Sequence, residues 1–183
     1  MTTIGHIFLG NGGQVQLQVG DWSHAYDGSS NAKIAARVAM DLRLCLKGAG
    51  PNHGGWEGGE DDALDPRDDA NRTNGQHVIS VEGPDAGLNG QSPEALAVEL
   101  YETGGAMAQA IARALVTIDL SMAARENAAE TSADPFDDFV RVRKGRADRA
   151  SLTEECLDGA DEDRVAGWRQ YVDAVLSAAG SSE

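Results

Sequence analysis

Lysine is nearly absent from this chain of 183 residues, since only Lys33, Lys47 and Lys144 occur. Acidic residues outnumber basic ones by 30 to 15, which gives a net charge of −15. Such a charge repels nucleic acid overall and favours basic proteins or divalent cations as partners. A high-salt cytoplasm or a GC-rich genome would also explain the excess of acids. The acidity alone therefore indicates either recognition or adaptation for solubility.

Aromatic residues and cysteines are also scarce. Aromatic residues make up 5% of the chain, which favours close packing of alanine-rich helices over a large aromatic core. The two cysteines, Cys45 and Cys156, form no CxxC pair, so we expect two buried free thiols in a reducing compartment. The sequence shows no signal peptide and no apolar run long enough to span a membrane. We therefore expect a cytoplasmic protein.

The strongest helical pattern runs from Ser92 to Ala129. Ser92 suits a helix N-cap and Pro93 suits the first helical position. Apolar or small residues follow at steps of three and four, as on one side of a helix: Leu96, Leu100, Gly104, Met107, Ile111, Leu115, Ile118 and Met122. Gly104 and Gly105 are poor helix formers. We predict a long central helix over about 92–129 that kinks or breaks near Gly104.

The remaining pattern predicts one mostly helical α+β domain over residues 1–183. Two strands over 3–19 surround the turn Asn11-Gly12-Gly13, and His77-Val78-Ile79-Ser80-Val81 resembles a third strand, so we expect a two- or three-stranded antiparallel sheet from residues 3–19 and 77–81. Residues 20–30 are expected to form a connection. Further helices are predicted at 31–47, from Asp134-Pro135, at 151–159 and at 161–178.

A long acidic loop over residues 48–75 interrupts this pattern. Its seven acidic side chains and Trp56 are the candidate partner-binding residues: Trp56, Glu57, Glu60, Asp61, Asp62, Asp65, Asp68 and Asp69. Loops of this length inside a domain are either functional or disordered. An exposed tryptophan among acids is a candidate anchor for a protein partner.

A metal site in this loop is the competing interpretation. His53 and His77 flank the carboxylates and could add nitrogen ligands to an oxygen-rich site. The spacing matches neither a calcium-binding loop nor an HExxH motif. We therefore favour a solvated acidic loop and expect no bound metal and no cofactor.

A basic segment lies further along the chain. Five of the 15 basic residues fall within nine positions: Arg141, Arg143, Lys144, Arg146 and Arg149. Arginines in such a cluster can bind phosphates through paired hydrogen bonds. In so acidic a chain, the segment more plausibly neutralises acids of its own chain or meets the acidic face of a second copy. The basic segment is therefore a second candidate partner-binding surface. We expect neither nucleic acid nor a membrane as its partner.

Candidates for catalysis are weak. Ser23 and His24 are adjacent, but neighbouring residues on a strand point to opposite faces, and no nucleophile motif accompanies them. We therefore expect a non-enzymatic interaction protein that occupies a basic site on a partner. In its narrower form it is an inhibitor that mimics nucleic-acid phosphates, as viral or mobile-element proteins do. The alternatives are a structural subunit of a larger assembly, such as a virion, and a metal-dependent enzyme.

Overall fold

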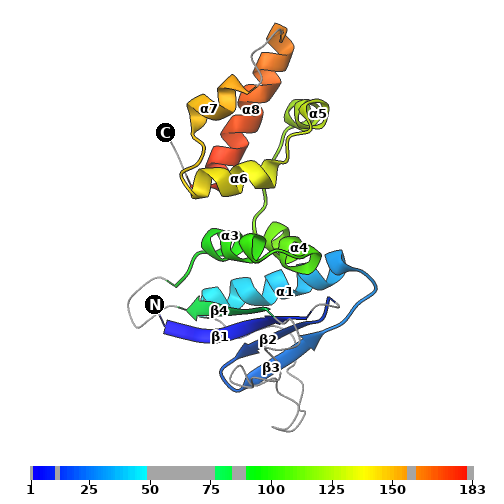
Figure 1. Cartoon of the computed structure of the whole chain (residues 1–183), viewed down its shortest axis with the longest axis vertical. Coiled ribbons are helices and arrows are strands. Elements are labelled where there is room, and N and C mark those ends of the chain that lie inside the picture. Colours follow the sequence, from blue (N-terminus) through cyan, green and yellow to red (C-terminus); the bar gives the residue numbers. More distant parts are fainter. Residues whose placement is uncertain (1, 11–12, 49–76, 84–89, 156–159, 181–183) are drawn as a thin grey trace. The chain divides into compact units, whose positions relative to one another are not determined.

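The computed structural model describes residues 2–10, 13–48, 77–83, 90–155 and 160–180. Contacts divide the chain into two compact units, Met1–Leu115 and Val116–Glu183, and each is described by itself. The described chain is α+β, with seven helices and one antiparallel sheet (Figure 1). The expectation of a single domain over 1–183 stays a prediction. No described helix has the length and apolar character needed to cross a membrane.

The sheet in the first unit has four strands, not two or three. They are β1 (Thr2–Leu9), β2 (Val15–Val19), β3 (Trp22–Tyr26) and β4 (His77–Gly83), in the spatial order β3-β2-β1-β4. The extra strand β3 lies where a connection was expected. It forms because Gly20 takes a left-handed turn (φ 57°) and three ring-bearing residues then alternate along the chain, which suits a strand.

Helices α1 (Asn31–Leu46), α3 (Pro93–Thr103) and α4 (Ala106–Leu115) cover one face of this sheet (Figure 1). Ile7 and Leu17 are opposite each other on that face and are fully buried. Tyr26, on the same face, donates a hydrogen bond of 2.5 Å to Asp41 of α1. Helix α1 begins and ends as predicted, with Ser30 as its N-cap and Gly48 (φ 75°) just beyond its end. Cys45 lies on the buried face of α1, whereas Cys156 lies outside the described residues.

The prediction of one long central helix over 92–129 is wrong. The stretch forms three helices, α3, α4 and α5 (Met122–Thr131). The first break, predicted near Gly104, is confirmed, because Gly104 and Gly105 both adopt positive φ angles between α3 and α4. The second break spans residues 116–121, where apolar and polar residues alternate at every second position, which is not a helical pattern.

The second unit contains the helices α5, α6 (Pro135–Arg143), α7 (Arg149–Glu154) and α8 (Glu162–Ala178). Helix α8 contacts the other three. Its buried residues meet the core residues of α6 and α7, and this core comprises Phe136, Phe139, Val140, Leu152, Trp168, Tyr171, Val172 and Val175. Helix α7 begins earlier than predicted, because Asp148 rather than Ser151 is its N-cap and the two residues form a reciprocal capping box.

Candidate functional site

The acidic loop predicted as the main partner-binding segment lies outside the described residues. This applies to its whole candidate set, Trp56, Glu57, Glu60, Asp61, Asp62, Asp65, Asp68 and Asp69, and to His53. The remaining candidates for a site lie in the part of the chain that the structure describes. Two cavities in it are large enough to hold a side chain or a small molecule, one in each unit.

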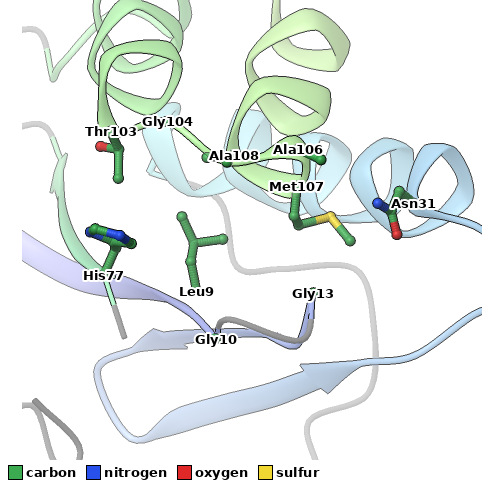
Figure 2. Close-up of a pocket in the computed structure, with 11 residues that line it drawn as sticks. Leu9, Gly10, Gly13, Asn31, His77, Thr103, Gly104, Ala106, Met107 and Ala108 are labelled. Carbon is green, nitrogen blue, oxygen red and sulfur yellow. The ribbon is translucent and has the colours of Figure 1, made fainter. Parts of the chain in front are cut away.

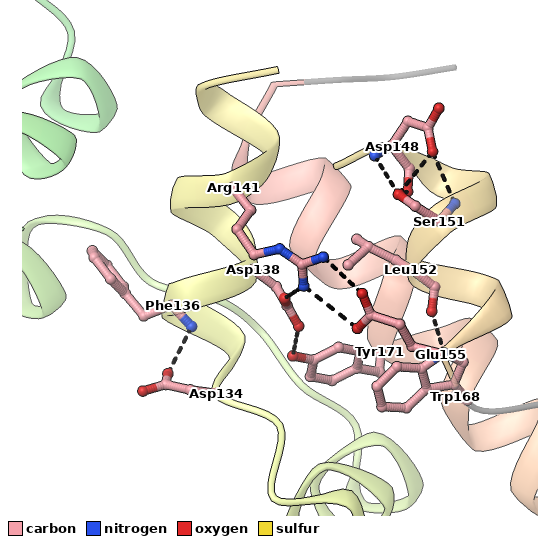
Figure 3. Close-up of polar contacts among 10 residues, drawn as sticks. All are labelled: Asp134, Phe136, Asp138, Arg141, Asp148, Ser151, Leu152, Glu155, Trp168 and Tyr171. Carbon is pink, nitrogen blue, oxygen red and sulfur yellow. Dashed lines mark hydrogen bonds and ion pairs between the residues drawn. The ribbon is translucent and has the colours of Figure 1, made fainter. Parts of the chain in front are cut away.

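Arg141, the first residue of the predicted basic segment, binds two carboxylates of its own unit. Its Nη1 donates a hydrogen bond of 2.6 Å to Asp138 one turn earlier, and its Nη2 donates one of 2.7 Å to Glu155 of the residues following α7 (Figure 3). The hydrogen bond with Glu155 is the main cause that raises the pKa of Arg141, and the bond with Asp138 adds to it. This arginine therefore holds α6 and the end of α7 together.

Two more residues of the basic segment also make contacts within the second unit. Arg143 donates to the backbone carbonyl of Ala179 at 3.2 Å, and Arg149 forms an ion pair of 2.6 Å with Asp173 of α8. Lys144 and Arg146 are exposed in the turn between α6 and α7. Whether the segment also meets a partner stays a prediction. Arg141, Arg143 and Arg149 nevertheless join separate parts of the unit, because each one bonds a residue distant in the sequence.

The cavity in the second unit, which we call the acidic pocket, has a volume of about 320 Å³. Its walls come from the end of α5, the first turns of α6, the end of α7 and the middle of α8. Its lining residues are Thr131, Ala133, Asp134, Asp137, Asp138, Arg141, Glu155 and Trp168. Four carboxylates thus share the pocket with one guanidinium group, so that at neutral pH the lining carries an excess of negative charge.

The positions of these carboxylates follow from local capping. Asp134 is the N-cap of α6 and accepts a hydrogen bond of 2.9 Å from the backbone N–H of Phe136 (Figure 3). Pro135 occupies the first helical position, and Asp137 stands in the first turn, where a negative charge stabilises the helix dipole. The sequence that starts α6 therefore also places two carboxylates in the lining of the acidic pocket.

Asp138 lies deepest among the acids and is only 5% exposed. Besides the bond from Arg141, it accepts a hydrogen bond of 2.6 Å from the hydroxyl group of Tyr171. Burial is the main cause that raises the pKa of Tyr171, and the bond to Asp138 raises it further. Two donors thus satisfy a buried carboxylate, which would otherwise be costly to desolvate.

Trp168 forms the aromatic part of the pocket wall. Its ring stacks on that of Tyr171 with centroids 4.5 Å apart, and its Nε1–H donates to the carbonyl of Leu152 at 2.7 Å (Figure 3). Both rings are therefore fixed before any ligand arrives. The rigid aromatic wall and the excess of carboxylates suit a cationic group, such as a lysine ammonium or an arginine guanidinium.

The cavity in the first unit has a volume of about 450 Å³ and a different lining. It lies between the β1–β2 turn and the start of α4 (Figure 2). Its polar side chains are Asn31, His77 and Thr103, and glycines and apolar residues form the rest. His77 is exposed there, and no group of three or more metal-ligating side chains occurs among the described residues.

Ser23 and His24 point to opposite faces of β3, as the strand geometry predicts. Ser23 accepts a hydrogen bond of 2.5 Å from the Gln16 side chain, whereas His24 lies between the rings of Trp22 and Tyr26 on the helix-covered face. The two side chains are therefore not arranged as a nucleophile and its base.

Sequence reasoning missed the acidic pocket. It placed the start of α6 correctly through Asp134 and Pro135, but it gave Asp137 and Asp138 no role in a site. One local signal could have shown the role of Asp138: it stands three residues before Arg141, so both side chains lie on one helix face. The contribution of Glu155 had no local signal.

Comparison with protein-family models, curated proteins and solved structures finds no match to this chain. The chemistry of the described residues is therefore what indicates a function.

Proposed function

We propose that this protein is a non-enzymatic interaction protein that presents carboxylates to a basic surface of a partner protein. The net charge of −15 supports a basic partner, because opposite fields accelerate and orient association. The loop residues Trp56 to Asp69 stay candidate contacts of that partner. The narrower form is an inhibitor whose carboxylates take the place of nucleic-acid phosphates.

The acidic pocket is the observation that carries this proposal. Carboxylates from α6 and from the end of α7 line one cavity of side-chain size, and they outnumber the guanidinium of Arg141 in its lining by four to one. A lysine or arginine of the partner would enter the pocket, contact Asp134 and Asp137, and lie against the Trp168 side of the wall. Most of the binding would depend on charge and would weaken with added salt.

The first experiment measures binding of a fluorescein-labelled oligo-arginine peptide to the full chain by anisotropy. Wild-type protein is compared with the Asp134→Asn and Asp137→Asn double variant, in which Asn preserves the N-cap of α6. We expect about tenfold weaker binding, since two charge contacts of up to about 1 kcal/mol each are lost. Raising NaCl from about 50 to about 500 mM should weaken wild-type binding as well.

The matched control is the Asp161→Asn and Asp163→Asn double variant. It makes the same change of charge at the same places, the N-cap and first turn of α8, but neither residue lines the acidic pocket. Equal losses of peptide affinity in both variants would mean that binding depends only on net charge, which would contradict binding in the acidic pocket. A third variant, with Asp61, Asp62, Asp65, Asp68 and Asp69 changed to Asn, tests the loop: unchanged binding would remove its proposed role.

A further inference from the structure

The sheet of the first unit has a second face, opposite to the face that α1, α3 and α4 cover (Figure 1). Side chains alternate between the two faces along a strand, and Ile7 and Leu17 lie on the helix-covered face. By this alternation and the strand pairing, the second face consists of Thr3, His6, Phe8, Gln16, Gln18, Ser23, Ala25, Val78, Ser80 and Glu82.

Phe8 is buried on the second face although the helices of its unit lie on the other side of the sheet. Its side chain is 2% exposed, whereas Val78, its partner on the edge strand β4, is 39% exposed. His6 and Gln16, which flank it, are half-buried. Side chains stand roughly perpendicular to a sheet, so neighbours shield the sides of a phenylalanine ring but not its outer end. A further part of the protein therefore covers Phe8.

Gln18, in the next row of the second face, gives the same indication. It is paired with His6, and its Oε1 is buried although it accepts no hydrogen bond from the residues that the structure describes. On an uncovered sheet face, water would reach such an oxygen and bond it. The cover over the second face therefore extends from Phe8 of β1 to β2.

Three of the four stretches of the first unit outside the described residues cannot supply this cover. Met1 adjoins the far end of β1, and residues 11–12 lie in a turn that the bond from Gly13 N–H to the Gly10 carbonyl closes. Residues 84–89 would have to run from Gly83 to the level of Val78, about 17 Å, and back again. The seven steps of extended chain between Gly83 and Gly90 span only about 25 Å in all.

The fourth stretch, residues 49–76, has the required length and position. It begins after Gly48 and ends before His77, so its last residue is two positions from Val78, the partner of Phe8. Its 28 residues span up to about 90 Å when extended, several times the width of a four-stranded sheet. This segment can therefore cross the second face and return.

The composition of the second face also suits this acidic segment. Of its ten residues, Glu82 alone is acidic and none is lysine or arginine, and most of the rest carry amide, hydroxyl or imidazole groups. Such groups can donate hydrogen bonds to carboxylates without like-charge repulsion. Phe8 and Val78 form the apolar centre of the face, and the large apolar side chains of residues 49–76 are Trp56 and Leu64.

We infer that the second face is the docking surface of the chain's own segment 49–76, with Trp56 packed against Phe8 and Val78. An indole is large enough to cover a phenyl ring, and a donor of the segment then satisfies Oε1 of Gln18. The carboxylates that follow Trp56 start from a fixed point on the sheet, which lowers the entropy lost when a partner binds them. The contact goes beyond the proposed function and does not require it, because no partner takes part in it.

The test follows the three tryptophans of the full chain by 19F NMR after labelling with 5-fluorotryptophan. A Trp56→Phe variant identifies the Trp56 signal, and the shift of this signal between H2O and D2O measures the exposure of the indole. In wild-type protein, the solvent shift of Trp56 should be well below its value in urea-unfolded chain. Val78→Asp places a negative charge beside Phe8 and should raise the solvent shift of Trp56 to the unfolded value.

The matched control is Met40→Asp. It makes the same change of charge at a side chain of nearly equal exposure, 40%, on α1 and outside the second face, so it should leave the Trp56 signal unchanged. A Trp56→Ala and Val78→Asp double variant adds a second measurement. Because Val78→Asp already breaks the contact, the urea midpoint of the double variant should fall no further than that of Val78→Asp alone.

A Trp56 side chain as exposed in wild-type protein as in the unfolded chain would overturn the inference. A buried Trp56 that does not respond to Val78→Asp, or that responds equally to Met40→Asp, would overturn it as well. A solvent shift that changes with protein concentration would assign the second face to another copy of the chain instead. The oligo-arginine titration tests the proposed function separately, because the acidic pocket lies in the second unit.

Discussion

Among the described residues, each unit has one buried aspartate that accepts a hydrogen bond from a tyrosine. Asp41 is fully buried and pairs with Tyr26 at 2.5 Å, and Asp138 pairs with Tyr171 at 2.6 Å. Both acids lie on helices at positions that face the core, so each needs donors to offset the loss of water. The tyrosine supplies one donor without adding a charge, and its ring adds apolar area to the core.

These pairs predict that the protein loses stability in alkali. Burial, and then the bond to the aspartate, raises the pKa of Tyr26 and of Tyr171 above the usual value of 10. Above pH 10 the unfolded chain releases both phenolic protons while the folded chain holds them. The free energy of unfolding therefore falls by about 1.4 kcal/mol per pH unit for each tyrosine, and below pH 10 this contribution is fully present.

Urea unfolding at several values between about pH 9 and pH 11 measures this slope, and absorbance at 295 nm shows when phenolate forms. In the Tyr171→Phe variant, the free energy of unfolding should fall less steeply with pH, by about 1.4 kcal/mol per pH unit. If both phenols of wild-type protein titrate near pH 10 while the chain stays folded, the assignment is wrong.

At the scale of the helices and strands, the sequence predicted the boundaries that depend on residues next to them in the chain. The N-caps of α3 and α6, the end of α1 at Gly48 and the break at Gly104 each follow from one or two residues. The second break, after Leu115, was missed because Ile118 and Met122 happen to continue the spacing of three and four of the preceding helix, although the residues between them alternate as in a strand. Arg43 also bonds the last carbonyls of α4 from 71 and 72 residues away, which no local pattern reveals.

Gly167 fixes how closely α5 and α8 approach each other. A Cβ atom at this position would overlap the side-chain nitrogen of Asn127 and lie 3.1 Å from the carbonyl oxygen of Ala123. We predict that Gly167→Ala lowers the free energy of unfolding by about 1–3 kcal/mol, although alanine is the better helix former. Thermal unfolding followed by circular dichroism gives the change.

The control is the Gly167→Ala and Asn127→Ala double variant. It removes the atom that the new methyl group overlaps, so a double-mutant cycle should show a stabilising interaction between the two changes. If the two changes are simply additive, the close approach of the helices is not the cause of the loss.

For the whole molecule, the sequence predicted an excess of acids but not where acids meet. Asp137 and Glu155 are 18 positions apart, and only the folding of α6 and α7 against α8 brings them into one pocket. The basic segment was recognised because five basic residues fall within nine positions. Arg141 of this segment nevertheless lies within that same acidic pocket, because it bonds Asp138 of its own helix and Glu155 beyond the end of α7.

Because the chain forms two compact units, we predict that a destabilising mutation in one unit leaves the stability of the other unchanged. Leu152 is fully buried in the second unit, so Leu152→Ala should destabilise that unit by about 2–5 kcal/mol. Hydrogen exchange followed by mass spectrometry should then speed up in residues 116–180 and stay unchanged in residues 2–115. Faster exchange in both ranges would instead show one cooperative domain over the whole chain.

The stack of Trp168 on Tyr171 gives the protein an optical reporter of its own. The indole is one of three in the chain, and it lies in the wall of the acidic pocket together with four carboxylates. Replacing Trp22 and Trp56 by phenylalanine would leave Trp168 as the single tryptophan. Its emission spectrum would then follow occupancy of the pocket directly, with no dye attached to either molecule.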